Sequence, residues 1–209
     1  MTLFINTSSS ETELALLAKG KLLASKSWES KMNESDKLLP AIADLLSENK
    51  LDPSALRKIM VVVGPGSFTG IRVGVSVANT LANSLQLPLL GITNPQLAIY
   101  RLDTQENLNK IFIHYALSQG NFFKQNASLA KAGKREGEIV HLRDVDLQVV
   151  FSSSLKDFKP EIRSLAEALL LLDQEFAGEK EIAKSRRSRT TVAQPFYVVP
   201  PAVSVKKKL

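Results

Sequence analysis

The residues that most suggest chemistry are Gly64-Pro65-Gly66-Ser67-Phe68-Thr69-Gly70, between an apolar strand and a helix. Glycine-rich loops that open a helix can bind phosphate, because free N–H groups of the first turn point at the anion. The lysine and hydroxyl residue of a nucleoside-triphosphate loop are missing, since Ile71 and Arg72 follow the last glycine. The pattern therefore favours a structural turn that presents the helix. The alternative is an anion or nucleotide site, whose contacts would be Thr7, Ser8, Gly66, Ser67 and Arg72.

A metal site is not predicted. Ribonuclease-H-like nucleases and actin-like phosphotransferases bind a divalent metal through an aspartate on the first strand, where this chain has Asn6. Hard cations prefer carboxylate oxygen, and a two-metal centre needs several converging carboxylates. No acidic residue occurs between Asp52 and Asp103. The two histidines, His114 and His141, each stand alone in a strand pattern and are interpreted as packed or edge residues. We therefore expect no catalytic residue and no independent activity.

Composition and charge indicate a globular protein with an unusual C-terminal end. Hydrophobic residues make up 44% and charged residues 23% of 209 positions, and there is no cysteine. The first residues lack the features of a signal peptide, and no apolar run reaches membrane-helix length, so we expect a cytoplasmic protein. Residues 180–209 hold 8 Lys/Arg and 1 Asp/Glu, a net +7, against +6 for the whole chain. Such a tail can bind phosphate backbones, although a solvated terminus is the favoured interpretation.

Hydrophobic patterns divide the first half of the chain into alternating elements. We expect strands over residues 2–7, 11–18, 21–28, 59–63 and 89–92, and helices over residues 34–49 and 71–86. The order β-β-β-α-β-α-β predicts an α/β fold with a mixed sheet and helices against it. This is the plan of a ribonuclease-H-like or actin-like domain.

The second half is less regular. It suggests strands over residues 111–117, 138–142 and 147–151, a helix over residues 161–176, a polar stretch over residues 119–137 that is loop in part, and a further strand near residues 195–201. In the predicted helix, Ile162 and several leucines are expected to face a core. We divide the chain into an N-lobe, residues 1–105, and a trimmed second lobe with the basic tail, residues 106–209.

The helix after the glycine loop carries almost no charge. Between Ile71 and Gln86 the only charged side chain is Arg72, whereas a surface helix usually has a charged face opposite its apolar stripe. We therefore expect this helix to be central in its own domain or covered by another protein. Its polar face is formed by Arg72, Ser76, Asn79, Asn83 and Gln86.

Several segments together resemble the TsaB family, also called YeaZ, over about residues 2–98. They are Ile5-Asn6-Thr7-Ser8, Lys37-Leu38-Leu39-Pro40-Ala41-Ile42, the glycine loop with Ile71-Arg72-Val73-Gly74, and Leu87-Pro88-Leu89-Leu90-Gly91-Ile92. A weaker match is Ala193-Gln194-Pro195-Phe196-Tyr197. The resemblance implies an actin-like (ASKHA) fold with a reduced second lobe.

The resemblance also implies a function. Members of this family are non-catalytic scaffold subunits in the formation of N6-threonylcarbamoyladenosine at position 37 of tRNAs that read ANN codons. They bind the catalytic paralogue TsaD and are joined by the ATPase TsaE. For the chain alone, a homodimer is one alternative that the sequence leaves open, and tRNA contact would be indirect or through the basic tail. No cofactor of its own is implied, and ATP or ADP at the partner interface is an alternative that the sequence leaves open.

By resemblance, the helices over residues 34–49 and 70–86 pack against two helices of the paralogue. The expected interface is Leu38, Leu39, Ile42, Leu45, Arg72, Val75, Asn79 and Ala82. The chain departs from the family pattern at Asn6, where aspartate is usual, and around residues 32–35, where a histidine is usual. Both departures weigh against metal or nucleotide chemistry in this chain. The alternative function is that of a small actin-like ATP-dependent phosphotransferase.

Overall fold

The computed structural model describes residues 1–31, 33–118, 121–141, 149–153, 161–176 and 193–195. A five-stranded mixed sheet is built from β1 (Thr2–Asn6), β2 (Glu11–Ala18), β3 (Lys21–Glu29), β4 (Lys58–Gly64) and β5 (Leu89–Thr93), in the order β3-β2-β1-β4-β5. The three N-terminal strands pair antiparallel, whereas β1, β4 and β5 run parallel. The five strands and the mixed sheet predicted from the sequence are confirmed.

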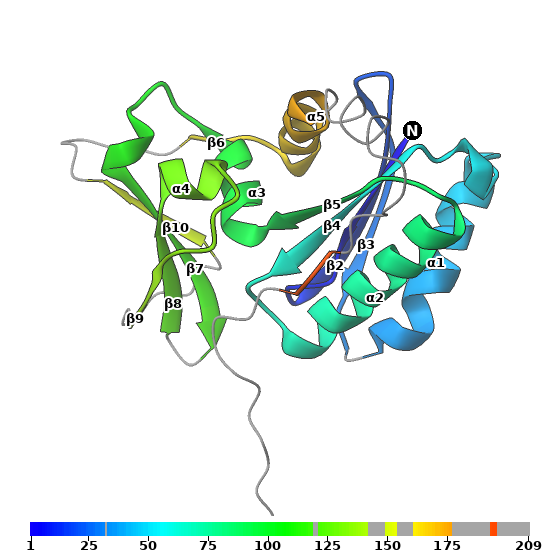
Figure 1. Cartoon of the computed structure of the whole chain (residues 1–209), viewed down its shortest axis with the longest axis horizontal. Helices are drawn as coiled ribbons and strands as arrows, with labels where there is room; N and C mark the ends of the chain where they lie inside the picture. The colour runs from blue at the N-terminus through cyan, green and yellow to red at the C-terminus, as the bar shows by residue number, and fades with distance from the viewer. Residues whose placement is uncertain (32, 119–120, 142–148, 154–160, 177–192, 196–209) are drawn as a thin grey trace, which may run out of the picture.

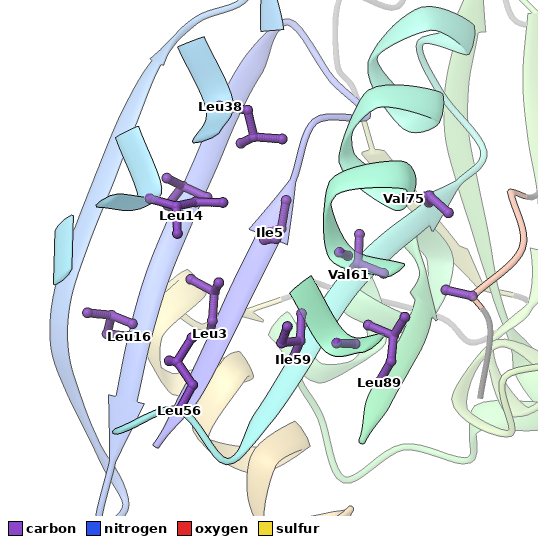
Figure 2. Packing of buried hydrophobic residues seen from close by; sticks show 14 of the residues in the cluster. Leu3, Ile5, Leu14, Leu16, Leu38, Leu56, Ile59, Val61, Val75 and Leu89 are labelled. Atoms are coloured by element: carbon purple, nitrogen blue, oxygen red, sulfur yellow. The ribbon is translucent and has the colours of Figure 1, made fainter. Parts of the chain in front are cut away.

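Two helices cover one face of this sheet, as Figure 1 shows: α1 (Glu34–Glu48) and α2 (Phe68–Ser84), with a short 3-10 turn at Pro53–Ala55. Their inner sides pack on alternate residues of the strands, and Figure 2 shows Leu38 of α1 and Val75 of α2 over Leu14, Ile5 and Val61. α2 begins three residues before the predicted start. The reason is the Ser67 hydroxyl, which caps the helix by accepting from the Gly70 N–H.

The opposite face is covered by α3 (Asn94–Arg101) and α5 (Leu165–Glu175), which pack on Phe4, Met60 and Val62. α5 starts later than predicted because Ser164 and Glu167 form a capping box. Glu161–Ile162 is instead a short strand, β11, paired with β6 (Leu102–Asp103). The expectation that Ile162 faces a core is wrong, since 51% of this residue is exposed.

A second sheet lies beyond α3 in the view of Figure 1. It contains β7 (Ile111–Ser118), β8 (Asn121–Asn126), β9 (Glu138–His141) and β10 (Val149–Ser153), all antiparallel, in the order β10-β7-β8-β9. Residues 119–137 were predicted to be loop in part, and residues 132–137 form no helix or strand, but β8 and α4 (Ala127–Lys131) within this stretch were not predicted. A 3-10 turn, Leu108–Lys110, precedes β7. The predicted strand near residues 195–201 and the basic tail lie outside the described residues, except Ala193–Pro195.

α5 follows the second sheet in the chain but packs against the first one. Its Asp173 carboxylate is the partner of the Lys58 ammonium of β4, at 2.7 Å, and accepts from the Thr2 hydroxyl of β1. None of the described helices is long and apolar enough to cross a membrane.

Candidate functional site

The glycine loop, residues 64–70, lies directly against the segment that follows β1. The Ser67 N–H donates to the Ser8 carbonyl at 2.7 Å, and the Thr7 hydroxyl donates to the Gly70 carbonyl at 2.7 Å. A Cβ atom on Gly66 would lie 2.1 Å from the Ser8 carbonyl oxygen, and one on Gly70 would lie 2.0 Å from that of Thr7. Glycine is required here because two backbones touch. The loop therefore fixes the N-terminus of α2 to the end of β1, as the structural interpretation of the sequence predicts.

A chain of polar side chains continues from this contact. The Asn94 amide, in the first turn of α3, donates to the Ser8 hydroxyl at 2.7 Å and to the Pro65 carbonyl at 2.6 Å. The Ser8 hydroxyl and N–H donate to the Asn6 amide oxygen, as in an Asx-turn. The Asn6 NH₂ group donates to the Glu13 carboxylate of β2 at 2.7 Å. We call Asn6, Ser8, Glu13 and Asn94 the polar chain.

Glu13 and Asn94 were not predicted from the sequence. Glu13 lies opposite Asn6 in the β1–β2 register, and its alternation with buried leucines could have placed it beside Asn6. The signal at Asn94 is weaker and consists of an Asn-Pro pair directly after a strand. An aspartate at position 6 would face the Glu13 carboxylate, so the neutral amide suits this neighbour.

Burial raises the pKa of the Glu13 carboxyl; the negative charge of Glu11 adds to this, while the Asn6 hydrogen bond and the Arg101 charge oppose it. The ionised carboxylate is therefore disfavoured by folding at neutral pH. Glutamine at position 13 would keep an oxygen acceptor for Asn6 without the buried charge. We expect Glu13→Gln to raise the melting temperature at pH 7. The gain should shrink as the pH falls through the raised folded-state pKa, because the native carboxyl is then neutral, and should vanish below the ordinary carboxyl pKa.

Thermal unfolding at pH 7 and at pH 4 measures this effect. Glu29→Gln, at the exposed end of the neighbouring strand β3, is the matched control and should change little at either pH. A lower melting temperature of Glu13→Gln at pH 7 would show instead that the ionised carboxylate supports the polar chain.

The residues predicted as anion contacts separate into two groups. Thr7 and Ser8 are each 1% exposed, and both hydroxyls donate within the chain, so the expectation that they contact an anion is corrected. Ser67 and Arg72 are exposed and Gly66 is half-buried at the start of α2. The Arg72 guanidinium lies over the Phe68 ring, 5.4 Å from its centroid. For these three residues an anion contact stays a prediction.

Most of the predicted partner-interface residues lie in the core of this chain. The residues that are at most 4% exposed are Leu38, Ile42, Leu45, Val75 and Ala82. All five belong to the core cluster between the two helices and the first sheet, because the apolar stripe of each helix packs on its own sheet. Figure 2 shows Leu38 and Val75 in this cluster. Their assignment to a partner interface is therefore corrected. Leu39, 50% exposed, and Arg72 remain on the surface.

The outer surface of α2 has the low charge that the sequence indicates. We define the α2 outer stripe as four of the exposed residues of this helix, Arg72, Ser76, Thr80 and Asn83, beside half-buried Val73, Val77 and Leu81. Arg72 is the only charged member. Asn79, which the sequence places on this face, is instead partly covered by Ala193 of this chain, through two hydrogen bonds. Among the described residues, Ala193–Pro195 make no hydrogen bond to the stripe itself.

The order β3-β2-β1-β4-β5, with two helices on one face, defines a ribonuclease-H-like α/β fold of the actin-like type. Comparison with solved structures agrees: YeaZ from Pseudomonas aeruginosa superposes with a TM-score of 0.56 at 22% identity, covering 86% of this chain and 93% of that one. A second structure, described as an uncharacterized protein with similarity to peptidase YeaZ, gives 0.57 at 19% identity. These likenesses show the fold.

Sequence comparisons identify proteins to which parts of the chain are similar. Residues 28–112 match the family profile "TsaD: tRNA N6-adenosine threonylcarbamoyltransferase". The tRNA threonylcarbamoyladenosine biosynthesis protein TsaB of Bacillus subtilis is 39% identical over 92 residues, 44% of this chain and 40% of that protein. The Escherichia coli TsaB protein is 32% identical over 59 residues, 28% and 26% of the two chains. Over these segments the chain is similar to TsaB (YeaZ) proteins. It spans less than half of the length of these two curated relatives.

Proposed function

We propose that this chain is a non-catalytic scaffold subunit in the formation of N6-threonylcarbamoyladenosine at position 37 of ANN-decoding tRNAs. In this role it binds a TsaD-type threonylcarbamoyltransferase through the outer surface of α1 and α2. The similarity to curated TsaB proteins over part of the chain, and the names of those relatives, support the proposal.

The observation that carries the docking surface is the α2 outer stripe. A helix face that stays exposed to water usually carries several charged side chains, whereas this stripe carries one. The core of a protein–protein interface is depleted in charged residues, so uncharged helix surface suits such a position. Leu39 adds an exposed apolar side chain on the neighbouring helix.

Leu39→Asp and Ser76→Arg should each weaken binding to the TsaD-type partner at least tenfold, about 1.4 kcal/mol. Each places a charge on an uncharged contact surface without entering the core, so the melting temperature should stay close to that of the native chain. Co-purification of the two proteins and a binding titration measure the effect.

The first sheet offers matched controls on a strand far from α2 in the strand order. Leu23 is 48% exposed and Ser25 is exposed, both on edge strand β3. Leu23→Asp and Ser25→Arg introduce the same charges and should leave binding unchanged. Equal weakening by the control variants, or none by the α1 and α2 variants, would contradict the docking surface.

The further parts of the proposal rest on the similarity to TsaB proteins. We expect a cytoplasmic assembly that a TsaE-type ATPase joins, with ATP or ADP bound at the partner interface and no cofactor in this chain alone. Self-association of the chain and tRNA contact through the basic tail are parts of the same proposal. The alternative, a small ATP-dependent phosphotransferase, is not favoured, because Asn6 stands where such enzymes carry a metal-binding aspartate.

A further inference from the structure

One C-terminal residue is held firmly against α2. The Asn79 NH₂ group donates to the Ala193 carbonyl at 3.0 Å, and the Ala193 N–H donates to the Asn79 amide oxygen at 3.0 Å. A side-chain amide that pairs with both backbone groups of one residue fixes the path of the chain there. Ala193 is 8% exposed and belongs to the core cluster beneath α1 and α2. Figure 1 draws residues 193–195 as a short orange segment beside α2.

The next residue, Gln194, is hydrogen-bonded to the turn between α4 and β9, which belongs to the second sheet's part of the molecule. The Arg135 guanidinium donates to the Gln194 carbonyl at 3.3 Å. Arg135 lies in the turn between α4 and β9, and hydrogen bonds from β8 fix the backbone of this turn. The Gln125 amide of β8, 2% exposed, donates to the carbonyls of Lys134 and Glu136, the two neighbours of Arg135. Arg135 is therefore presented by an ordered backbone.

Two consecutive backbone positions thus join α2 of the first sheet to the α4–β9 turn of the second. We propose that Ala193–Pro195 is a latch that couples the second sheet to α2, with Asn79 and Arg135 as its two positioning residues. Loss of the hydrogen bonds at either Asn79 or Arg135 frees the latch and weakens the contact at the other residue. Because α2 belongs to the proposed docking surface, the latch would also make that surface sensitive to the second sheet; this consequence alone rests on the proposed function.

Residue-resolved amide exchange of the full chain, without any partner, tests the coupling. The Ala193 N–H reports the Asn79 grip, and the Lys134 N–H, which donates to the Leu129 carbonyl at 3.0 Å, reports the turn. Asn79→Ala should speed exchange at Lys134, which Asn79 does not touch. Reciprocally, Arg135→Met should speed exchange at Ala193. An acceleration of at least threefold is expected at each distant site.

Two matched variants separate the latch from general loosening. Asn83→Ala removes an exposed asparagine one turn further along α2, and Lys131→Met removes an exposed cation from α4. Both should leave exchange at Ala193 and Lys134 unchanged. If Asn79→Ala speeds exchange only at Ala193, and Arg135→Met speeds it only at Lys134, the two contacts are independent and the latch is refuted. This outcome would leave the partner-binding test unaffected.

Discussion

Gly70→Ala is expected to destabilise the chain by roughly 3 kcal/mol, although alanine is the better helix former by about 1 kcal/mol. Gly70 lies in the first turn of α2, and an added Cβ would lie 2.0 Å from the Thr7 carbonyl oxygen. Backbone atoms cannot move aside as a side chain can, so β1 and α2 must separate. Urea unfolding followed by circular dichroism measures the loss.

Gly74 provides a contrast one turn later. Its added Cβ would lie 2.2 Å from the Thr7 hydroxyl oxygen, a side-chain atom. Thr7→Ala should therefore rescue Gly74→Ala in part and should not rescue Gly70→Ala. Ser76→Ala, at an exposed position of the same helix, should stay within about 0.5 kcal/mol of the native chain. Native-like stability of Gly70→Ala would show that the loop and β1 are not in contact.

The first sheet was predictable because its elements have clear periodicity. β2 alternates in polarity, β4 is a short apolar run bounded by Lys58 and the glycine loop, and α1 repeats leucine and isoleucine at helical spacing. Local chemistry sets a further boundary at Asp52, whose carboxylate caps the 3-10 turn by accepting from the Ser54 N–H.

The elements near the second sheet were missed for physical reasons. All residues of α3 from Asn94 to Tyr100 are buried, so the helix has no polar side to contrast with an apolar one. β8 reads Asn-Phe-Phe-Lys-Gln-Asn, and its polar residues hydrogen-bond within the chain: Gln125 to the α4–β9 turn and Asn126 to carbonyls near β7. In both α3 and β8, tertiary contacts rather than the local sequence pattern determine the structure.

The site shows the same division. The contact between the glycine loop and β1 was predictable as a structural turn, because glycine spacing reports backbone geometry. The interface residues were not, because Leu38 and Val75 repeat at a spacing that fits burial against the chain's own sheet as well as against a partner. Only exposure separates these cases, and it assigns Leu39 rather than Leu38 to the surface.

The second large effect is expected at the contact between α5 and the first sheet. Lys58→Met should destabilise the chain by about 2 kcal/mol at pH 7, because it leaves the mostly buried Asp173 carboxylate without its cation. The side chain of Asp173 is 25% exposed, which keeps the cost below that of a fully buried charge. Urea unfolding at several pH values measures the loss.

The pH dependence of Lys58→Met identifies the cause. Burial raises the pKa of Asp173, but hydrogen bonds from Lys58 and Thr2 and the charge of Lys58 outweigh this, so the pKa lies below its ordinary value. The stabilisation is therefore present above the ordinary carboxyl pKa and is lost as the pH falls through the lowered folded-state pKa. The deficit of Lys58→Met should accordingly be largest near neutral pH and should shrink in acid.

Two further variants separate this ion pair from a loss of packing. Lys26 pairs with Asp44 and Glu48 on the exposed side of α1, and Lys26→Met should cost less than about 0.5 kcal/mol. Adding Asp173→Leu to Lys58→Met should recover most of the lost stability, because no unpaired charge then remains buried. A deficit that persists unchanged in acid and in the double variant would mean that the Lys58 side chain stabilises α5 through its methylene groups, by packing.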